Sequence, residues 1–345
     1  MPSIHAIKHD AKKLLSIKSI SECSKLLNTE QHKLVLLSQK PTYKVYEIPK
    51  KNGLYRLIED PETNLKKVLR KLNAFLQAVY FAKRPDCVHG FCISADKEES
   101  RTILSNAKKH IGKPYLLNID LKDFFHSITT QLIYEVFSKQ FPRFQSDLTD
   151  TLINLCSYHH RLPMGSPTSP VLSNFASIEM DTLLMQYCNY SGINYTRFAD
   201  DLTFSSTKPI TKIDIEEIRN SILKQHFIIN ENKVKYYLPT DEKTVTGLII
   251  TENEVVLPAN YIDKLKQEIE RMKQTMLVEQ RYRTGMSHKK LELFKQELIG
   301  KWNFAHTIMP ENEEIFNLKD EIEIASNPTD TFESMDWLDI PYSIL

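Results

Sequence analysis

Three aspartates stand where the surrounding sequence is otherwise apolar. Asp120 follows the apolar run of residues 115–119, and Asp200 and Asp201 separate the segments YTRFA and LTFSS. A carboxylate beside a buried strand is unfavourable unless a cation or hydrogen bonds compensate its charge. Carboxylate oxygens suit Mg²⁺, which takes its other ligands from water and from substrate phosphates. If the three aspartates meet, two such ions about 4 Å apart would activate an attacking oxygen and stabilise a leaving one in phosphoryl transfer.

The aspartate pair also has a simpler interpretation. Asp is common in tight hairpin turns, so the pair at 200–201, taken alone, fits a turn better than a metal site. Motifs elsewhere in the chain reverse this preference.

Three segments resemble the motifs of reverse transcriptases and occur in that family's order. Residues 198–201, Phe-Ala-Asp-Asp, are similar to its aromatic-x-Asp-Asp signature. Residues 118–125, NIDLKDFF, are similar to its first catalytic motif, and residues 162–170, LPMGSPTSP, are similar to its nucleotide-pocket loop. The resemblance extends over residues 40–305, and the order and spacing of the motifs make a chance match remote.

Two further elements resemble bacterial retron reverse transcriptases in particular. Asn106 and His110 belong to an Asn-Ala-x-x-His element, and Val245, Thr246 and Gly247 form a Val-Thr-Gly element. We therefore interpret the chain as a retron enzyme, ahead of group II intron relatives. The first pair is expected to organise RNA or the fold. The triplet is expected to position template or primer, because Gly247 allows a close backbone approach.

The resemblance implies a catalytic role for four residues. Asp120, Asp200 and Asp201 are expected to hold two Mg²⁺ ions, which lower the pKa of the primer hydroxyl and neutralise charge on the triphosphate. Lys233 resembles the lysine of a later motif that is expected to protonate the leaving pyrophosphate.

Other residues are expected to bind the sugar and the phosphates of the incoming nucleotide. Phe125 stands at the position that resembles the steric gate, where its ring would meet a 2′-OH and favour deoxynucleotides. A core aromatic is the alternative interpretation, and it suits the neighbouring Phe124. Arg56, with Lys50 or Lys51, is a candidate for the triphosphate, because a planar guanidinium donates two bonds to phosphate.

The pocket loop departs from the family pattern at one position. Gly165 lies in a proline-rich turn where the absence of a Cβ lets backbone approach the nucleotide. Met164 precedes it where relatives usually have Gln, so an amide able to contact nucleotide or template is missing. We expect this change to affect rate or fidelity rather than activity. Phe198 replaces the more frequent Tyr and keeps the ring without the hydroxyl.

A mixed helical and strand pattern must position these residues. Helical periodicity covers five stretches before residue 256, namely 4–39, 62–84, 129–158, 171–190 and 211–225. Strands are predicted at 115–119, in a hairpin of residues 43–61 turning at Asn52-Gly53, and in a hairpin of residues 193–206. Residues 226–237 and 244–250 are predicted to complete the sheet.

These elements predict an α+β right-hand polymerase. Residues 1–39 would form an N-terminal helical extension, and residues 40–255 the fingers and palm, with an antiparallel palm sheet backed by helices. Residues 256–310 would form a helical thumb that grips duplex through phosphates. Residues 311–345 would be an acidic tail, in which four apolar residues favour a docking peptide over a disordered end: Trp337, Leu338, Ile340 and Tyr342.

The net charge of +1 hides an asymmetry along the chain. Residues 311–345 carry ten acidic residues and one lysine, which leaves 44 basic and 34 acidic residues in 1–310. A basic body of this kind fits a nucleic-acid partner. The five cysteines form no CxxC pair, and no long apolar run or signal core is present. We therefore expect a cytoplasmic protein without a membrane span.

The retron resemblance implies an RNA-directed DNA polymerase that uses dNTPs. A cognate structured noncoding RNA would supply template and 2′-OH primer, and the product would be branched RNA–DNA, msDNA. Such systems usually defend bacteria against phage through a separately encoded effector protein, which would be a partner. Two alternatives stay open: a defence reverse transcriptase outside the retrons, and a nucleic-acid-binding module with an inactive polymerase site.

Overall fold

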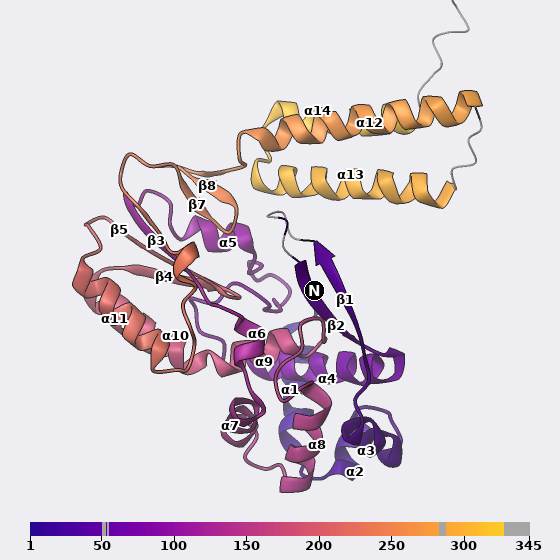
Figure 1. Ribbon diagram of the computed structural model, residues 1–345, viewed down its shortest axis with the longest axis vertical. Helices are drawn as coiled ribbons and strands as arrows, with labels where there is room; N and C mark the ends of the chain where they lie inside the picture. The colour runs from indigo at the N-terminus through magenta and orange to yellow at the C-terminus, as the bar shows by residue number, and fades with distance from the viewer. Residues whose placement is uncertain (50–52, 54, 283–287, 328–345) are drawn as a thin grey trace, which may run out of the picture. The chain divides into compact units, whose positions relative to one another are not determined.

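The computed structural model describes residues 1–49, 53, 55–282 and 288–327 (Figure 1). The chain divides into two compact units. The first comprises Met1–Thr246 with Ile250–Glu254, and the second comprises Gly247–Ile249 with Val255–Leu345. No described helix combines the length and apolarity needed to cross a bilayer.

A four-stranded antiparallel sheet is the centre of the first unit. Its strands lie in the order β4 (Asn194–Phe198), β5 (Asp201–Ser206), β3 (Tyr115–Asp120) and β6 (Lys235–Tyr237). The apolar residues of β3 and β5 are buried, as expected for central strands. The helix α10 (Ile178–Ser191) packs on β4 and on α11 (Lys212–Leu223), so helices back the sheet as the sequence predicts (Figure 1).

The predicted hairpin near the N-terminus is present as β1 (Tyr43–Pro49) and β2 (Tyr55–Pro61). These strands pair antiparallel along their whole length, from Tyr43 opposite Pro61 to Pro49 opposite Tyr55. Lys50, Lys51 and Asn52 lie outside the described residues. The predicted turn is therefore not characterised.

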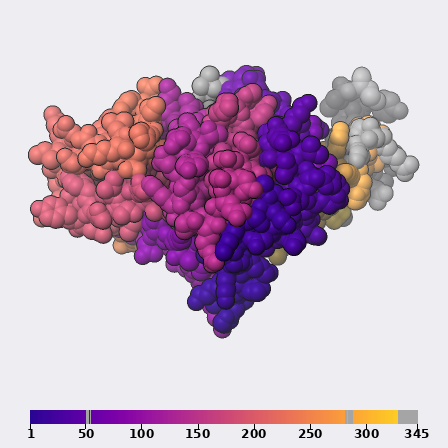
Figure 2. Space-filling model, turned by 90° about the horizontal axis from the view of Figure 1, so that it is seen from below, coloured from indigo at the N-terminus to yellow at the C-terminus, as the bar shows by residue number. Residues whose placement is uncertain are grey.

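The N-terminal helices share one hydrophobic core with the palm. They are α1 (Ile4–Ser16), α2 (Ile20–Leu26) and α3 (Gln31–Gln39), and α1 packs along α4 (Thr63–Phe81). Their buried leucines belong to the same cluster as the residues of the sheet. In the space-filling view their indigo surface adjoins the magenta surface of the palm helices (Figure 2). Residues 1–39 are thus built into the first unit.

Two long predicted helical stretches are each divided in the structure. Residues 129–158 form α7 (Thr130–Gln140) and α8 (Ser146–Cys156). The break falls at Phe141, because the residue before Pro142 is disfavoured in helical conformation. Residues 171–190 belong to α9 (Ser169–Ala176) and α10, which meet at Ser177. The short helices α5 (Ile103–Lys108) and α6 (Phe124–Ser127) complete the unit.

The expectation that residues 244–250 complete the central sheet is wrong. The strands β7 (Lys243–Val245), β8 (Leu248–Ile250) and β9 (Val255–Val256) form a separate three-stranded sheet. Thr246 and Gly247 both have positive φ, which folds β8 back on β7. Residues 226–237 also contain little strand, because a turn of 3₁₀-helix, η1 (Glu231–Lys233), precedes the short β6.

The described part of the second unit contains three helices. They are α12 (Asn260–Tyr282), α13 (His288–Ile308) and α14 (Glu313–Ser326), which pack against one another around an apolar core (Figure 1). The indole of Trp302 is buried between α13 and α14 and donates to the carbonyl of Ile315 at 2.7 Å. Residues 256–310 are thus mainly helical as predicted, and their role as a thumb stays a prediction.

The helix α14 occupies part of the segment that we expected to be an acidic tail. Ile315, Leu318 and Ile322 recur at helical spacing and are fully buried, so their burial anchors the segment despite its acidic surface. Glu314 and Glu323 pair with lysines of α12 and α13. The remainder of the tail, with Trp337, Leu338, Ile340 and Tyr342, lies outside the described residues.

If α14 belongs to the core of the second unit, Leu318→Ala will lower the free energy of unfolding by about 2–5 kcal/mol, because it removes a fully buried side chain. Urea unfolding measures this loss. Ile324→Ala on the exposed face of the same helix is the matched control and should change stability by less than about 0.5 kcal/mol. Equal effects of both substitutions would contradict the packing of α14.

Candidate active site

The strand register brings the three predicted aspartates together. Asp120 at the end of β3 is the pairing partner of Asp201 at the start of β5, and Asp200 lies in the turn between β4 and β5. The backbone N–H of Leu121 donates to the carbonyl of Asp200 at 2.9 Å, which ties the turn to β3. Carboxylates 80 residues apart in sequence therefore meet at one end of the sheet.

Two side chains from the segment after α11 bind the carboxylate of Asp120. Asn230 Nδ2 donates to Oδ1 and Lys233 Nζ donates to Oδ2, both at 2.9 Å. The backbone N–H of Asn230 also donates to the carbonyl of Asp120 at 2.8 Å. The hydrogen bond with Asp120 raises the pKa of Lys233, so the ammonium is retained beside the aspartates. Asn230 is a site residue that the sequence interpretation did not single out.

Negative charge at this end of the sheet is only partly compensated. Burial, with the charge of Asp120, raises the pKa of Asp200 despite the opposing charges of Lys233 and Arg56. Asp201 as a whole residue is exposed to solvent. Nearby protein atoms nevertheless keep part of the solvent away from its carboxylate. Their desolvating effect, followed by the charges of Asp200 and Asp120, raises the pKa of Asp201 to about 7. A bound cation would relieve this repulsion.

The aspartates fit an open cation site rather than a closed cage. Among the described residues, no group of three or more His, Cys, Asp and Glu side chains is arranged so that it could hold a metal ion without further ligands. Mg²⁺ is usually held by one or two carboxylates, with water and substrate phosphates completing its shell. Asp120 is buried, Asp200 half-buried and Asp201 exposed, so together they would suit this ion if substrate supplied the remaining ligands.

Aromatic rings lie next to the aspartate turn. Phe91 stands between Phe125 and Phe198, with ring centroids 5.9 and 6.5 Å away. Phe124 is buried in the core, whereas Phe125 is only half-buried. This difference supports the steric-gate interpretation of Phe125, because an accessible ring can meet a sugar.

The loop of residues 162–170 is held against β2 by Glu59. The buried carboxylate of Glu59 accepts two bonds from Arg161, at 2.8 and 2.9 Å, and one from the backbone N–H of Met164 at 3.2 Å. The N–H of Glu59 donates to the carbonyl of Met164 at 2.7 Å. Burial disfavours the charged carboxylate, but Arg161 more than offsets it and lowers the pKa of Glu59.

Gly165 is required by this contact with β2. Its φ is +127°, and a Cβ at this position would lie 2.9 Å from the carbonyl oxygen of Glu59. We expected the glycine to allow approach of a nucleotide, and the structure adds a contact within the protein. Neither Glu59 nor Arg161 carried a sequence signal for this role, because the pair is separated by 102 residues.

Arg56 lies on β2 with an exposed side chain. Its positive charge is close enough to lower the pKa of Asp200, although burial dominates that shift. Arg56 is therefore placed to attract an anionic group bound at the aspartates. Lys50 and Lys51, the other candidates for this role, lie outside the described residues.

The residues that resemble retron-specific elements are mainly structural. His110 is fully buried and bridges β4 and β5 through Thr196 Oγ1 and Ser205 Oγ, both at 2.7 Å. Asn106 and Val245 are also fully buried. In this structure the side chains of all three are buried, which favours the fold-organising alternative for Asn106 and His110, while the role of Val245 in positioning template or primer stays a prediction.

The remaining residues of the Val-Thr-Gly element lie nearer the surface. Thr246 is half-buried and its hydroxyl donates to the carbonyl of Ile103 at 3.4 Å, while Gly247 is exposed. Gly247 is therefore the member of the element that a template or primer can approach.

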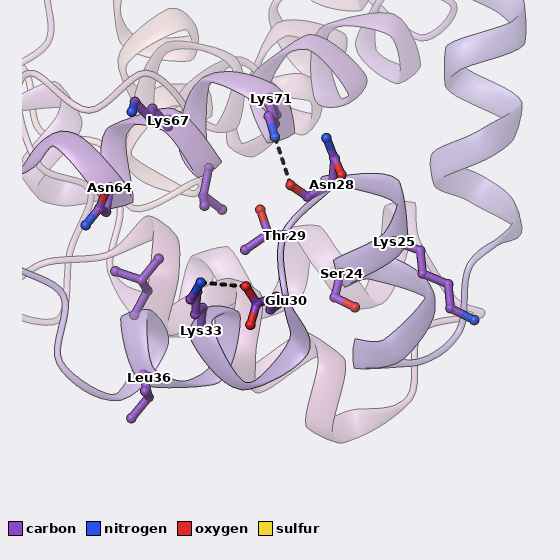
Figure 3. Close-up of a pocket in the computed structure, with 12 residues that line it drawn as sticks. Ser24, Lys25, Asn28, Thr29, Glu30, Lys33, Leu36, Asn64, Lys67 and Lys71 are labelled. Atoms are coloured by element: carbon purple, nitrogen blue, oxygen red, sulfur yellow. Dashed lines mark hydrogen bonds and ion pairs between the residues drawn. The ribbon is translucent and has the colours of Figure 1, made fainter.

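A lysine-lined hollow of about 980 Å³ lies between α2, α3 and α4 (Figure 3). Four lysines surround it: Lys25, Lys33, Lys67 and Lys71. Lys71 is fixed by the carbonyls of Leu27 and Asn28, and Lys33 pairs with Glu30. None of the aspartates lines this hollow. It is a second polar surface of the first unit, apart from the aspartates.

The central sheet is antiparallel, is backed by helices and gathers three carboxylates at one end. This arrangement is that of the palm of a nucleotidyl-transferring polymerase. Residues 48–251 match the family described as reverse transcriptase (RNA-dependent DNA polymerase). The chain belongs to this family, and its relatives place it among the bacterial retron enzymes. It is an RNA-directed DNA polymerase of a retron.

The similar curated proteins are retron reverse transcriptases. The chain is 31% identical to retron Ec83 reverse transcriptase of Escherichia coli, over 64% of this chain and 72% of that one. It is 29% identical to retron Ec86 reverse transcriptase of the same species, over 70% and 74%. Retron Mx162 reverse transcriptase of Myxococcus xanthus is 28% identical, over 60% and 47%.

Solved structures that match the chain include telomerase from Candida albicans with a fragment of telomeric RNA, at a TM-score of 0.47 and 10% identity. That match covers 84% of this chain and 64% of the other. The foamy viral protease–reverse transcriptase with double-stranded DNA matches with a TM-score of 0.41 and 17% identity, over 83% and 44%.

Burial of His110 predicts a specific loss of stability in acid. Burial lowers the pKa of His110 to about 3, below its ordinary value of 6.5. The unfolded chain therefore binds a proton that the folded chain does not, and stability falls as the pH drops below about 6.5. Between pH 6 and 4 this residue should remove roughly 2 kcal/mol.

His110→Gln should lose that part of the pH dependence, measured by urea unfolding at a series of pH values. The exposed His9→Gln is the control and should follow the wild-type curve. An unchanged acid slope in His110→Gln would show that the folded protein protonates this side chain.

Proposed function

We propose that the protein extends a 2′-OH of its cognate noncoding RNA with dNTPs, using that RNA as template, and so makes branched RNA–DNA (msDNA). The convergence of Asp120, Asp200 and Asp201 beside Lys233 carries the proposal. Membership of the retron reverse transcriptases supports the choice of template and product. By analogy with such systems, we infer a role in defence against phage, with a separately encoded effector.

The three aspartates would hold two Mg²⁺ ions. When bound, the ions supply charge neutralisation and lower the pKa of the attacking hydroxyl. Lys233 donates to the carboxylate of Asp120 and would give a proton to a leaving phosphate oxygen. Arg56 faces the same negative centre from β2 and would bind the triphosphate.

Two groups would shape the nucleotide pocket. The half-buried ring of Phe125 would exclude a ribose 2′-OH and so select dNTPs. The loop with Met164 and Gly165, which Glu59 fixes to β2, would present backbone to the base or sugar. Met164 offers no amide to template or nucleotide, so rate or fidelity should depend on its packing.

Two other functions are weaker. An inactive nucleic-acid-binding module would have no need of three carboxylates held together against their mutual repulsion. A defence reverse transcriptase outside the retrons would not need a cognate RNA. The identities to retron enzymes favour the retron function.

The first test is to purify the protein from its native locus and sequence the nucleic acid that accompanies it. We expect a short DNA joined through a 2′,5′ linkage to one structured RNA. An Asp200→Ala, Asp201→Ala preparation should contain the RNA without this DNA, because the carboxylates that hold the cations are lost. DNA without an RNA branch would favour a non-retron polymerase. RNA alone in both preparations would contradict polymerase activity.

The lysine-lined hollow supports a second contact with the RNA backbone, and it generates a separate prediction. Lys25 and Lys67 line it, and neither side chain forms a hydrogen bond or ion pair within the described part of the chain. In a Lys25→Gln, Lys67→Gln variant, the slope of log affinity for the cognate RNA against log salt should fall by roughly 1.5, because two phosphate contacts are lost.

Filter binding at several salt concentrations measures this slope. Lys8→Gln, Lys12→Gln on the exposed face of α1 removes the same charge elsewhere and should leave the slope unchanged. The same loss in both variants would indicate only a general effect of net charge. DNA synthesis on a short generic primer–template should remain in both.

A further inference from the structure

Arg197 is fully buried next to the aspartate turn, although burial of a guanidinium is costly unless each donor finds a partner. Its Nε and Nη2 donate to the two carboxylate oxygens of Asp181, at 2.8 and 2.7 Å. Its Nη1 donates to Asn174 Oδ1 and to the carbonyl of Ala199, both at 3.1 Å. The arginine thus holds the backbone immediately before Asp200.

The turn that carries Asp200 is strained and is held from several sides. Ala199 has a φ of +58°, a left-handed conformation that costs an alanine roughly 1 kcal/mol or more. On the C-terminal side of the turn, the carbonyl oxygen of Asp200 accepts a hydrogen bond from the backbone N–H of Leu121. On the opposite side, Gly90 packs so closely that a Cβ there would lie 2.6 Å from the nitrogen of Ala199.

These two hydrogen bonds have a geometric consequence for Asp200. The carbonyl of Ala199 lies in the same rigid peptide plane as the nitrogen of Asp200, and the carbonyl of Asp200 lies in the next plane. Arg197 holds the first plane and Leu121 holds the second. Because both planes are held, the direction of the Cα–Cβ bond of Asp200 is set.

Asn174 joins the two sides of this support. Its Oδ1 accepts from Arg197, and its Nδ2 donates to the carbonyl of Gly90 at 2.9 Å. The backbone around Gly90 is itself tied to β4, since the N–H of His89 donates to the carbonyl of Arg197 at 2.9 Å. One buried amide from α9 therefore links the arginine to the segment that packs on Ala199.

We propose that Arg197, together with Asn174, is a positioning residue that aims the carboxylate of Asp200 into the active site. A bidentate pair with Asp181 fixes the plane of the guanidinium, so its remaining nitrogen meets Ala199 at a set place. The inference rests on the proposed function, in which Asp200 holds a cation. A buried ion pair is by itself weak evidence of a stabilising role. We therefore assign the pair of Arg197 and Asp181 a positional role.

Two variants and one control test the proposal. Arg197→Lys keeps the charge opposite Asp181, but a compact ammonium cannot replace the planar fork and also reach Ala199. Asn174→Ala leaves the ion pair intact and removes the link to Gly90. Tyr195→Phe is the matched control, because the hydroxyl of Tyr195 donates to the same Asp181 at 2.8 Å without touching the turn.

The first readout is hydrogen exchange of the backbone amides at 198–201 and at Leu121, in protein without substrate. The second is the Mg²⁺ concentration that gives half the maximal rate, with kcat and KM, on an RNA template with a DNA primer. Thermal unfolding verifies that each variant is folded.

In Arg197→Lys and Asn174→Ala we expect faster hydrogen exchange in the turn, and a half-saturating Mg²⁺ concentration that is about tenfold higher. We expect kcat to fall by ten- to a hundredfold, while KM for primer–template stays unchanged. Tyr195→Phe should unfold at a lower temperature but match the wild type in all these readouts.

The proposal would be overturned if a folded Arg197→Lys or Asn174→Ala variant kept the hydrogen exchange and the Mg²⁺ dependence of the wild type. It would also be overturned if Tyr195→Phe shifted these two readouts as much as the other variants do. If Arg197→Lys does not fold, Asn174→Ala decides alone. If the wild-type protein makes no DNA, the proposed function fails, and hydrogen exchange still decides whether Arg197 positions the turn.

Discussion

The pairing of β3 with β5 places Asp120 opposite Asp201, and side chains from two other segments of the first unit compensate for this contact. Like charges directly across an antiparallel pair are destabilising. Lys233 and Asn230 bind Asp120 from one segment, and the charge of Arg56 acts on Asp200 from another. Burial, followed by the charges of Asp200 and Asp120, still raises the pKa of Asp201 to about 7. The negative charge that remains would attract cations, and cations bound there would in turn bind a triphosphate.

Polar pairs join the elements that meet around this centre. Glu59 and Arg161 join β2 to the pocket loop, and Arg197 and Asp181 join β4 to α10. Such pairs have strict requirements of distance and direction, whereas apolar contacts tolerate sliding. They therefore suit an active site, where the backbone must hold a carboxylate in one orientation.

Local patterns in the sequence predicted most of the elements and the identity of the chemical residues. The apolar run before Asp120 and the two segments around Asp200 are strands as expected, because burial and alternation are properties of neighbouring residues. The predictions failed where a distant contact decided the outcome. Residues 244–250 pair among themselves instead of joining the palm sheet, and Ile315, Leu318 and Ile322 draw an acidic segment into a helical core.

The sequence by itself determined which side chains can do chemistry and the family to which they belong, because motifs are read along the chain. Only the tertiary structure decided which of them meet. Lys233 reaches Asp120 across 113 residues, and Asn106 and His110 are buried and so support the fold. The physical reason is that charge and hydrogen bonding depend on separation in space, and strand register, set by the whole core, converts distant positions into neighbours.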